Sequence, residues 1–195
     1  VVTGIGGVEG NGQHELAEAL AKVRSPRRGR IEWTGGLSRV SYIPADRHLE
    51  GLALDLSVTE NLLAGYHRQP TFKLGPLLRL VRIRQWARSL VAKFQIQTND
   101  PEAPVRRLSG GNQQRVVVAR SLDGDPGVVV AVNPTRGLDF ASTRSVRASL
   151  RDAVQRGACV VLFSSDADEL EEVSDKILYM GGGRLYHDRL QALGR

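Results

Sequence analysis

The sequence predicts an α/β fold in which a parallel sheet is flanked by helices and interrupted by a helical insertion. Two observations predict it. Short β-branched runs alternate with segments of helical periodicity along the last third of the chain, as in a parallel sheet with crossover helices. Between Ser57 and about Leu122 the apolar residues recur mainly at helical spacing. The length of 195 residues suits one compact domain.

Composition excludes several classes of protein. No apolar run approaches the roughly 20 residues that a membrane-spanning helix needs. The single cysteine, Cys159, excludes an internal disulfide and a zinc site built from cysteines, and its apolar neighbours predict a buried thiol. The 27 Lys and Arg residues exceed the 21 Asp and Glu residues, which gives a net charge of +6. Because only 5% of residues are aromatic and no nucleic-acid-binding motif is found, we expect no nucleic-acid partner.

Three elements are predicted in the first part of the chain. Val1–Ile5 is a buried strand, and because a domain seldom begins inside a strand, we expect the chain to be a fragment of a longer protein. A helix follows Gly12 and ends at Ser25-Pro26. Its apolar face consists of Leu16, Ala19, Leu20 and Val23. Val40–Ile43 is a second strand, which Pro44 closes.

The region from Ser57 to Leu122 is predicted to be helical. Ser57 and Glu60 form a capping box at its start. Further along, apolar residues follow a helix period and arginines stand between them. The apolar positions are Leu77, Leu80, Val81, Ile83, Trp86, Leu90 and Phe94, and the arginines are Arg79, Arg82, Arg84 and Arg88. The arginines form either a solvated face or a surface that docks on a partner or a membrane.

Strands and helices alternate in the last third of the chain. Strands are predicted at 128–132, 158–163 and 177–180. Helices are predicted at 143–154 and 168–173. This alternation is what predicts the parallel sheet.

The first functional motif is a glycine-rich stretch between the first strand and the first helix. Gly7 and Gly12 have the spacing of a phosphate loop, in which backbone N–H groups and a helix N-terminus surround phosphate oxygens. Gln13 stands where that motif has its lysine, and His14 where it has the hydroxyl that binds Mg²⁺. A dinucleotide-binding pattern fits less well because a third glycine in register is missing. The candidate phosphate-binding residues are Gly7, Gly10, Asn11, Gly12, Gln13 and His14.

The segment from Leu108 to Arg115 resembles the signature sequence of ABC-type ATPases, L-S-G-G-x-Q. Ser109 and the following glycine amides stand at the start of a predicted helix, where they can bind a terminal phosphate that another subunit presents. The valines at 116–118 favour a strand by propensity, but the motif predicts a helix through them. The candidate signature residues are Leu108, Ser109, Gly110, Gly111 and Gln113.

Three further segments resemble motifs of the same family but lack its chemical groups. The turn from Pro134 to Asp139 is complete and places Asp139 in the D-loop position. Val132 and Asn133 replace the Asp–Glu pair that supports Mg²⁺ and activates water in that family. Ser165 replaces the switch histidine, so no catalytic residue is intact. In the Q-loop region, Ala45, followed by Asp46, replaces the usual glutamine.

These five segments occur in family order, so the resemblance covers almost the whole chain. Residues 42–63 make it similar to the second, C-terminal ATP-binding domain of simple-sugar and nucleoside importers, whose two ABC domains are fused. The resemblance implies one ABC nucleotide-binding domain over residues 1–195 with a P-loop NTPase fold. It also implies a RecA-like core at 1–56 and 123–195 and a helical subdomain at 57–122.

The resemblance also implies cofactors and partners. They are ATP, Mg²⁺ held only weakly at the chain's own site, a second ABC domain fused upstream, transmembrane permease subunits and, indirectly, a periplasmic or extracellular solute-binding protein. The implied location is the cytoplasmic face of the membrane. In such a pair each ATP site joins one domain's phosphate loop to the other's signature. We therefore expect this chain to complete its partner's ATP site while its own site does not turn over.

Two other functions fit the same residues. A non-transport ABC protein, such as a translation or DNA-repair factor, would account for the basic charge, although the insertion between Ser57 and Leu108 is short beside the coiled coils of repair proteins. A structural or regulatory module that no longer binds nucleotide would account for the substitutions. The transported solute is set by the binding protein and membrane domains, so this sequence does not specify it.

Overall fold

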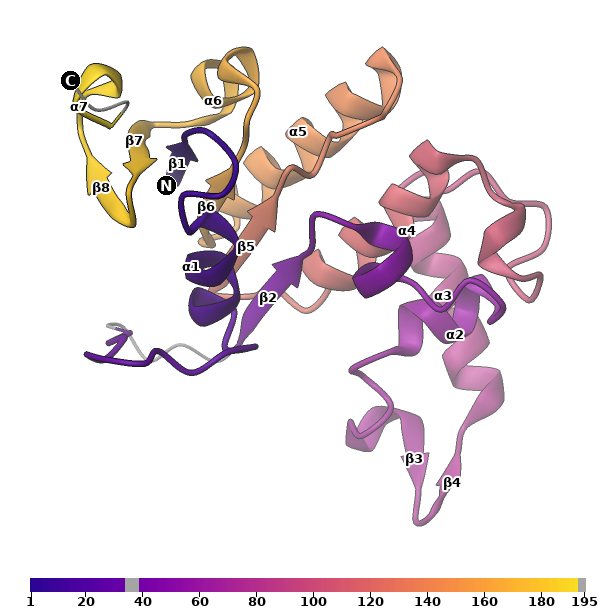
Figure 1. Cartoon of the computed structure of the whole chain (residues 1–195). Coiled ribbons are helices and arrows are strands. Elements are labelled where there is room, and N and C mark those ends of the chain that lie inside the picture. The colour runs from indigo at the N-terminus through magenta and orange to yellow at the C-terminus, as the bar shows by residue number, and fades with distance from the viewer. Residues whose placement is uncertain (34–38, 193–195) are drawn as a thin grey trace.

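A six-stranded sheet lies at the centre of the part of the chain that the structure describes, residues 1–33 and 39–192 of a computed structural model (Figure 1). Its strands are β1 (Val2–Gly6), β2 (Val40–Ile43), β5 (Val128–Val132), β6 (Cys159–Phe163), β7 (Lys176–Gly181) and β8 (Arg184–Tyr186). They lie in the order β2-β5-β6-β1-β7-β8, and all neighbours are parallel except the antiparallel pair β7 and β8. The predicted α/β class with a parallel sheet is therefore confirmed.

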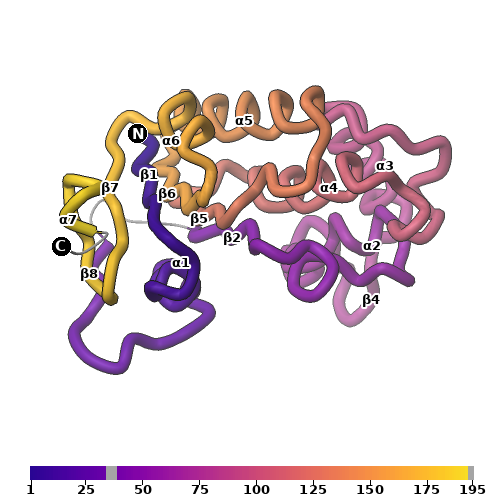
Figure 2. The backbone as a smooth tube through the Cα atoms, turned by 45° about the horizontal axis from the view of Figure 1, so that its top comes forward, coloured from indigo at the N-terminus to yellow at the C-terminus, as the bar shows by residue number. Residues whose placement is uncertain are grey.

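Helices cover both faces of this sheet (Figure 2). They are α1 (Gln13–Leu20) on one face, and α4 (Gly110–Leu122), α5 (Phe140–Gln155) and α6 (Ala167–Val173) on the other, with the short α7 (Arg189–Ala192) after β8. Every residue of β5 is buried. Val128, Val130 and Val132 pack with Ala17 of α1, whereas Val129 and Ala131 pack with α4 and α5. A parallel strand covered on both faces is expected to be apolar throughout, as this one is.

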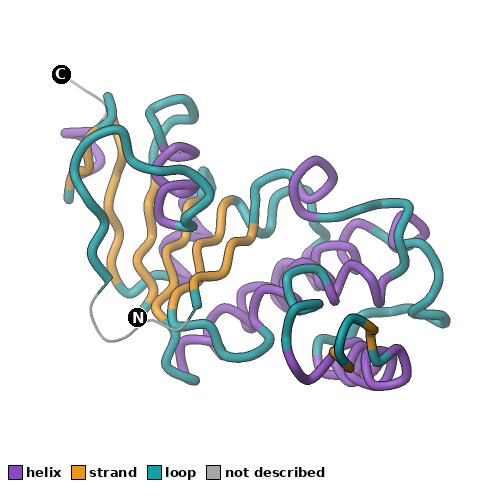
Figure 3. Tube along the Cα trace, turned by 90° about the horizontal axis from the view of Figure 1, so that it is seen from below, coloured by secondary structure: helices purple, strands orange, loops and turns teal. Residues whose placement is uncertain are grey.

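The segment between β2 and β5 is mainly helical and stands beside the strand-rich part of the chain (Figure 3). It contains α2 (Val58–Leu63), α3 (Leu80–Lys93) and α4, and a hairpin of β3 (Lys73–Leu74) and β4 (Leu77–Leu78). Single helical turns occur at η1 (Arg47–Gly51), η2 (Pro70–Phe72) and η3 (Val105–Arg107). Helix α4 belongs to both parts, because its valines pack in the same core as α2 and the sheet. None of the helices among the described residues is long and apolar enough to span a membrane.

Arg39, just before β2, joins the sheet edge to the helical segment. Its guanidinium donates to the backbone oxygens of Asp123, at 2.6 Å, and of Arg120 and Ser121, both at 3.1 Å. It also donates to the Tyr66 hydroxyl and lies 4.8 Å from the centre of the Tyr66 ring. These contacts satisfy the carbonyls at the end of α4, which the helix itself leaves without partners.

Several predictions of local structure are confirmed. Ser57 accepts a hydrogen bond from the Glu60 N–H and Glu60 accepts one from the Ser57 N–H, so α2 begins with a capping box. The valines at 116–118 lie in α4. In this case the start of the helix and its burial against the sheet override the strand propensity of valine.

The predicted extent of the first helix is wrong. Helix α1 ends at Leu20, and Lys22 has a φ of +61°, which a helix does not allow. Val23 was expected on the apolar face, but 62% of it is exposed. The apolar pattern in the sequence continues to Val23, although the helix itself ends at Leu20.

Two further expectations are wrong. The helical pattern predicted from Leu77 begins only at Leu80, because Gly75, with a φ of +61°, turns the chain into the β3–β4 hairpin. Leu77, Leu80 and Val81 are exposed rather than buried. Cys159 is also exposed. It begins β6, where side chains alternate, so Ala158 and Val160 point inward and the thiol between them points outward.

Candidate functional site

The glycine-rich loop links the end of β1 to the start of α1. Gly7, Gly10 and Gly12 have φ values of +142°, +92° and +103°, a region that favours glycine. A side chain at Gly7 would also collide with the backbone, since a Cβ atom there would lie 2.4 Å from the carbonyl oxygen of Met180. Gly12 precedes the first turn of α1. The loop therefore places a helix N-terminus at its end, as a phosphate loop does.

Gln13 folds back into this loop. Its Nε2 donates to the backbone oxygen of Val8 at 2.8 Å, and its Oε1 accepts the backbone N–H of Asn11 at 3.1 Å. A lysine at position 13 would have no oxygen to accept that N–H, which would then remain for a ligand. One of the loop amides is therefore already satisfied by the substituted side chain.

Asn11 fixes the loop to the sheet edge. Its side-chain Nδ2 donates to the Val8 oxygen at 2.8 Å, and its Oδ1 accepts the backbone N–H of Gly182 at 2.8 Å. Its own carbonyl accepts the N–H of Gly183 at 3.1 Å. Since Gly182 and Gly183 form the turn between β7 and β8, the loop is held by protein contacts on its own.

A cleft of about 240 Å³ brings together positions that the sequence places far apart. Its lining includes the predicted phosphate-loop residues Gly7, Gly10, Gln13 and His14, together with Ala45, Val132, Asn133 and Ser165. The substituted positions of the resemblance thus share one site. Asp46 and the signature residues do not line it.

Two charged residues of this cleft were not identified from the sequence. Glu9 and Arg136 both line it and form an ion pair at 3.1 Å, with both side chains about two-thirds exposed. Each occupies a variable position of its motif, so no motif marked it. The sequence carries no signal of this pair, because Glu9 and Arg136 come together only in the fold.

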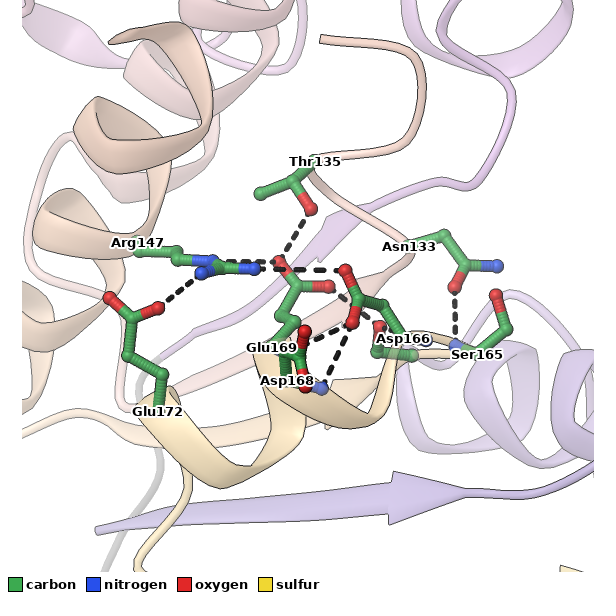
Figure 4. Close-up of polar contacts among 9 residues, drawn as sticks. Asn133, Thr135, Arg147, Ser165, Asp166, Asp168, Glu169 and Glu172 are labelled. Carbon is green, nitrogen blue, oxygen red and sulfur yellow. Dashed lines mark hydrogen bonds and ion pairs between the residues drawn. The ribbon is translucent and has the colours of Figure 1, made fainter. Parts of the chain in front are cut away.

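Two of the residues at the catalytic positions, Asn133 and Ser165, are hydrogen-bonded to each other. Asn133 has a φ of +43°, and its Oδ1 accepts the backbone N–H of Ser165 at 3.0 Å (Figure 4). Val132 is 5% exposed and packs in an apolar cluster with Ile5 and Phe163. Neither Val132 nor Asn133 has a carboxylate that can accept a proton from water.

These groups do not fit a magnesium ion. Mg²⁺ takes oxygen ligands, usually one or two carboxylates with substrate phosphates. The one carboxylate lining the cleft is Glu9, which is paired with Arg136, and His14 offers nitrogen. Within residues 1–33 and 39–192, no group of three His, Cys, Asp or Glu side chains is placed to hold a metal ion.

Beside the cleft, a buried carboxylate ties three segments together (Figure 4). Glu169 of α6 is 1% exposed and accepts hydrogen bonds from the hydroxyls of Thr135 and Ser164, each at 2.7 Å. Arg147 of α5 lies 3.7 Å from it and also pairs with Asp166 and Glu172. The turn after β5 and the switch segment after β6 are therefore joined through one side chain. Sequence reasoning missed Glu169, because a lone glutamate on a helix carries no signal of burial.

The signature residues surround the start of α4. Ser109 is exposed, and its hydroxyl accepts a hydrogen bond from Asn112 at 3.0 Å. Gly111 is required, since a Cβ atom there would lie 2.2 Å from the Ser142 hydroxyl. Gln113 is buried and bonds His48 at 2.8 Å, while Leu108 packs on the core. Ser109 is thus exposed at the start of a helix whose first turn is largely buried.

The Q-loop region contacts this signature. Asp46 accepts the N–H groups of His48 and Leu49, at 2.8 and 3.0 Å, and so begins the turn η1. The hydrogen bond from Leu49, followed by that from His48, holds the pKa of the Asp46 carboxyl below its usual value. Arg47 lies over Gly110, within 3.0 Å of where its Cβ would be. The segment that supplies Ala45 to the cleft therefore also touches the signature helix.

Asp139, the D-loop candidate, begins α5. Its carboxylate accepts the Ser142 N–H at 2.9 Å and the Ser142 hydroxyl at 2.8 Å. These bonds, the backbone one first, hold the pKa of Asp139 below its usual value. In this structure the carboxylate is a helix cap that stands next to Gly111 of the signature.

The Asp139→Asn variant is expected to lose stability at neutral pH but not in acid. Because the pKa of Asp139 is lowered by folding, the charged form contributes stability above its unfolded pKa of about 3.9. That contribution is lost as the pH falls from there through the folded pKa. The urea midpoint of wild type is therefore expected to exceed that of Asp139→Asn at pH 7, and the two are expected to converge once the pH falls below the folded pKa of Asp139.

Glu171→Gln is the matched control for this experiment. Glu171 is exposed on α6, and within the described residues its side chain makes no hydrogen bond or ion pair. Its urea midpoint is expected to follow wild type at both pH values. If the urea midpoints of wild type and Asp139→Asn differed by the same amount at every pH, ionisation of Asp139 would not be linked to stability.

Comparison with known proteins identifies relatives over most of the chain. Residues 1–136 match the sequence profile of the family described as ABC transporter. The guanosine import ATP-binding protein NupO of Bacillus subtilis (strain 168) is 36% identical over 196 residues, which cover 94% of this chain and 38% of that protein. The glucose import ATP-binding protein TsgD13 of Haloferax volcanii is 37% identical over 200 residues, which cover 96% of this chain and 36% of that protein. The chain thus spans little more than a third of these relatives.

Solved structures show the same fold. The ATP-binding cassette MJ0796, in a dimeric post-hydrolysis state bound to ADP and Pi, matches with a TM-score of 0.75 at 21% identity. The match covers 94% of this chain and 82% of that one. A second match, an inward-facing conformation of a metal-chelate type transporter, has a TM-score of 0.76 at 20% identity, over 94% of this chain and 70% of that one.

Proposed function

The chain belongs to the ABC transporter family, and from this we propose that it is the ATP-binding domain of an importer for sugars or nucleosides. The relatives NupO and TsgD13 are import ATP-binding proteins for guanosine and for glucose. The chain spans little more than a third of their length. The partners that we propose for it are a second nucleotide-binding domain, fused upstream, and permease subunits. A solute-binding protein delivers the solute, and the domain works at the cytoplasmic face of the membrane. Its helical subdomain is residues 57–122 and its core the remainder.

The observation that carries this proposal is an asymmetry between two sites on the chain. The cleft collects Gln13, His14, Val132, Asn133 and Ser165, none of which supplies the chemistry of hydrolysis. The signature at the start of α4, by contrast, keeps an exposed serine and two glycines. We infer that the domain supplies its signature to the partner's ATP site and keeps its own site as a weak, non-hydrolysing one.

Each substitution in the own site removes a defined contribution. Replacing a lysine by Gln13 loses a charged hydrogen bond to phosphate, which is worth about 1.5–3 kcal/mol. The loop still offers backbone N–H groups and the start of α1, which support weak binding of the ATP phosphates, while the charge of Arg136 is offset by its ion pair with Glu9. Asn133 and Val132 leave no carboxylate base, a loss of roughly 10² to 10⁴ in rate. These losses act on one reaction and do not multiply.

ATP supplies the phosphates that the two sites bind. This chain contributes a different set of residues to each site, and the partner domain contributes the rest. In its own cleft the glycine amides orient a nucleotide that Asn133 and Ser165 leave intact. In the partner's site, Ser109 and the amides of Gly110 and Gly111 bind the terminal phosphate from the opposite side. Asp139 holds the start of α5 against that signature.

The first test is ATP binding and hydrolysis by the purified chain. Wild type is expected to bind ATP weakly and to hydrolyse it below about 1 s⁻¹, the lower end of usual enzyme turnover. Gln13→Lys is expected to tighten ATP binding at least about tenfold, since it restores a charged contact and frees the Asn11 N–H. Titration calorimetry measures the affinity, and phosphate release measures the rate.

The matched control adds the same charge away from the cleft. Gln155→Lys changes an exposed residue at the end of α5 and is expected to leave ATP affinity within about twofold of wild type. Equal effects of the two lysines, or steady hydrolysis by wild type, would contradict the assignment of the own site.

One observation favours a second candidate function, a structural module without nucleotide. The hydrogen bonds of Gln13 and Asn11 satisfy the loop from within. If neither wild type nor Gln13→Lys binds ATP, this function replaces the first for the own site.

A further inference from the structure

The positive charge of the protein is concentrated in one part of the helical segment. Residues 61–99 contain seven Lys and Arg residues and no Asp or Glu. The rest of the chain, with 20 basic and 21 acidic residues, has a net charge of −1. The net charge of +6 therefore arises entirely within this stretch.

The same stretch exposes large apolar side chains. Five of them, Leu74, Leu77, Leu78, Leu80 and Val81, are between 42% and 69% exposed. They lie on the β3–β4 hairpin and the first turn of α3, which project away from the sheet and from α1 (Figure 1). Single exposed apolar residues are ordinary, but five within eight positions form a patch that indicates a binding surface.

Basic side chains border these apolar ones. Lys73 begins the hairpin, and Arg79 and Arg82 flank Leu80 and Val81. Within the described residues, the seven cations of the stretch form a single ion pair, Arg84 with Glu102 at 3.2 Å. We call the five apolar residues together with Lys73, Arg79 and Arg82 the hairpin patch.

We propose that the hairpin patch binds an anionic lipid surface, with the leucines at the hairpin tip entering the headgroup region. Exposed leucines bordered by Lys and Arg are typical of segments that lie in a membrane interface. The tip is convex, since a side chain at Gly75 would meet nothing within 4 Å. Leucine side chains carry no polar group and can pack against acyl chains, while the Lys and Arg side chains can bind lipid phosphates.

Charge argues against a permease loop as the main occupant. Cytoplasmic loops of membrane proteins carry an excess of Lys and Arg, so they would repel a segment with a charge of +7. The cytoplasmic leaflet is negative and attracts it. The proposal rests on the proposed function only in placing the domain at that leaflet.

The test is co-sedimentation of the 195-residue chain with vesicles, without nucleotide or permease. Vesicles of phosphatidylglycerol mixed with phosphatidylcholine are expected to bind wild type at least about tenfold more tightly than pure phosphatidylcholine. Binding to the anionic vesicles is expected to weaken with added salt. No preference for anionic vesicles would overturn the proposal.

Two double variants separate the electrostatic and apolar contributions. Arg79→Gln with Arg82→Gln is expected to weaken binding to anionic vesicles about tenfold or more, since each basic residue near the surface contributes about fivefold. Leu74→Ser with Leu77→Ser is expected to weaken binding while preserving its dependence on salt. Both variants change exposed side chains, so circular dichroism and thermal melting are expected to match wild type.

Matched controls change the same residue types elsewhere. Arg144→Gln on α5 and Val23→Ser after α1 also alter exposed side chains and are expected to bind within about twofold of wild type. Equal loss in the controls would mean that binding is not localised to the hairpin patch, which would overturn the assignment. So would binding that requires permease in the vesicles and is lost in the hairpin variants, because the partner would then be protein.

A fluorescent probe gives an independent measurement. In a Cys159→Ser background, Leu77→Cys carries an environment-sensitive dye, which is expected to shift to shorter wavelength with anionic vesicles and to be quenched by lipid-borne quenchers. The same dye at Val23→Cys is expected to change little, and a dye at Leu77 that remains in water would overturn the proposal. ATP binding takes no part in either assay, so failure of the lipid proposal and failure of the proposed function are distinguishable.

Discussion

Ser109→Arg is expected to reduce ATP turnover by the assembled importer about a hundredfold or more. Ser109 is exposed at the start of α4, directly before Gly110 and the buried Gly111. An arginine side chain there occupies the space that the partner's nucleotide must enter. Loss of one pre-arranged donor at a reacting centre costs about 10² to 10³ in rate. The measurement is phosphate release by the full transporter in membranes.

The control for this variant is Ser89→Arg on the exposed side of α3. It introduces the same side chain away from the signature, and turnover is expected to stay within about twofold of wild type. Co-purification with the permease subunits checks that both variants assemble. If Ser109→Arg assembles and turns over like wild type, the signature is idle and the structural module becomes the better account.

Glu169→Ala is expected to destabilise the fold by about 3 kcal/mol or more. Its carboxylate is 1% exposed and accepts the hydroxyls of Thr135 and Ser164, with Arg147 at 3.7 Å. Removing the buried carboxylate leaves the two hydroxyls without their acceptor and Arg147 without its buried counter-charge. The alanine also leaves a cavity between α6 and the sheet. Urea denaturation at pH 7 measures the loss.

Two further variants define the origin of that loss. Glu169→Gln keeps a hydrogen-bonding group in place and is expected to lose less than Glu169→Ala. Glu171→Ala, on the exposed face of the same helix, is expected to stay within about 0.5 kcal/mol of wild type. A loss below about 1 kcal/mol for Glu169→Ala would mean that water replaces the carboxylate readily.

The sheet could be predicted from sequence because its central strands carry a simple signal. Residues 128–132 are all apolar and β-branched or small, and strand β5 begins and ends where they do. The hairpin at 73–78 could not be predicted, since its leucines at helical spacing resemble the helix that follows. Gly75 and Pro76 were the only local signs of a turn. The same leucines fit a helical and a strand pattern, and packing in the folded chain determines which of the two forms.

The cleft was predictable in part. Gly7, Gln13, Asn133 and Ser165 stand in motifs, and the structure gathers them around one space. The Glu9–Arg136 ion pair joins residues far apart in sequence at variable positions, so no local pattern points to it. The hydrogen bonds of Gln13 within the loop depend on the conformation of its side chain, which cannot be predicted from composition or motif spacing.

The hydrogen bonds within the glycine loop determine how readily position 13 accepts a lysine. The Val8 carbonyl accepts two donors, Gln13 Nε2 and Asn11 Nδ2, both at 2.8 Å. A return to lysine at position 13 therefore leaves no backbone carbonyl without a donor. Val132 is different, because an aspartate there would be buried against Ile5 and Phe163. A carboxylate at position 132 therefore meets a desolvation cost in strand β5 that a lysine at position 13 does not meet in the loop.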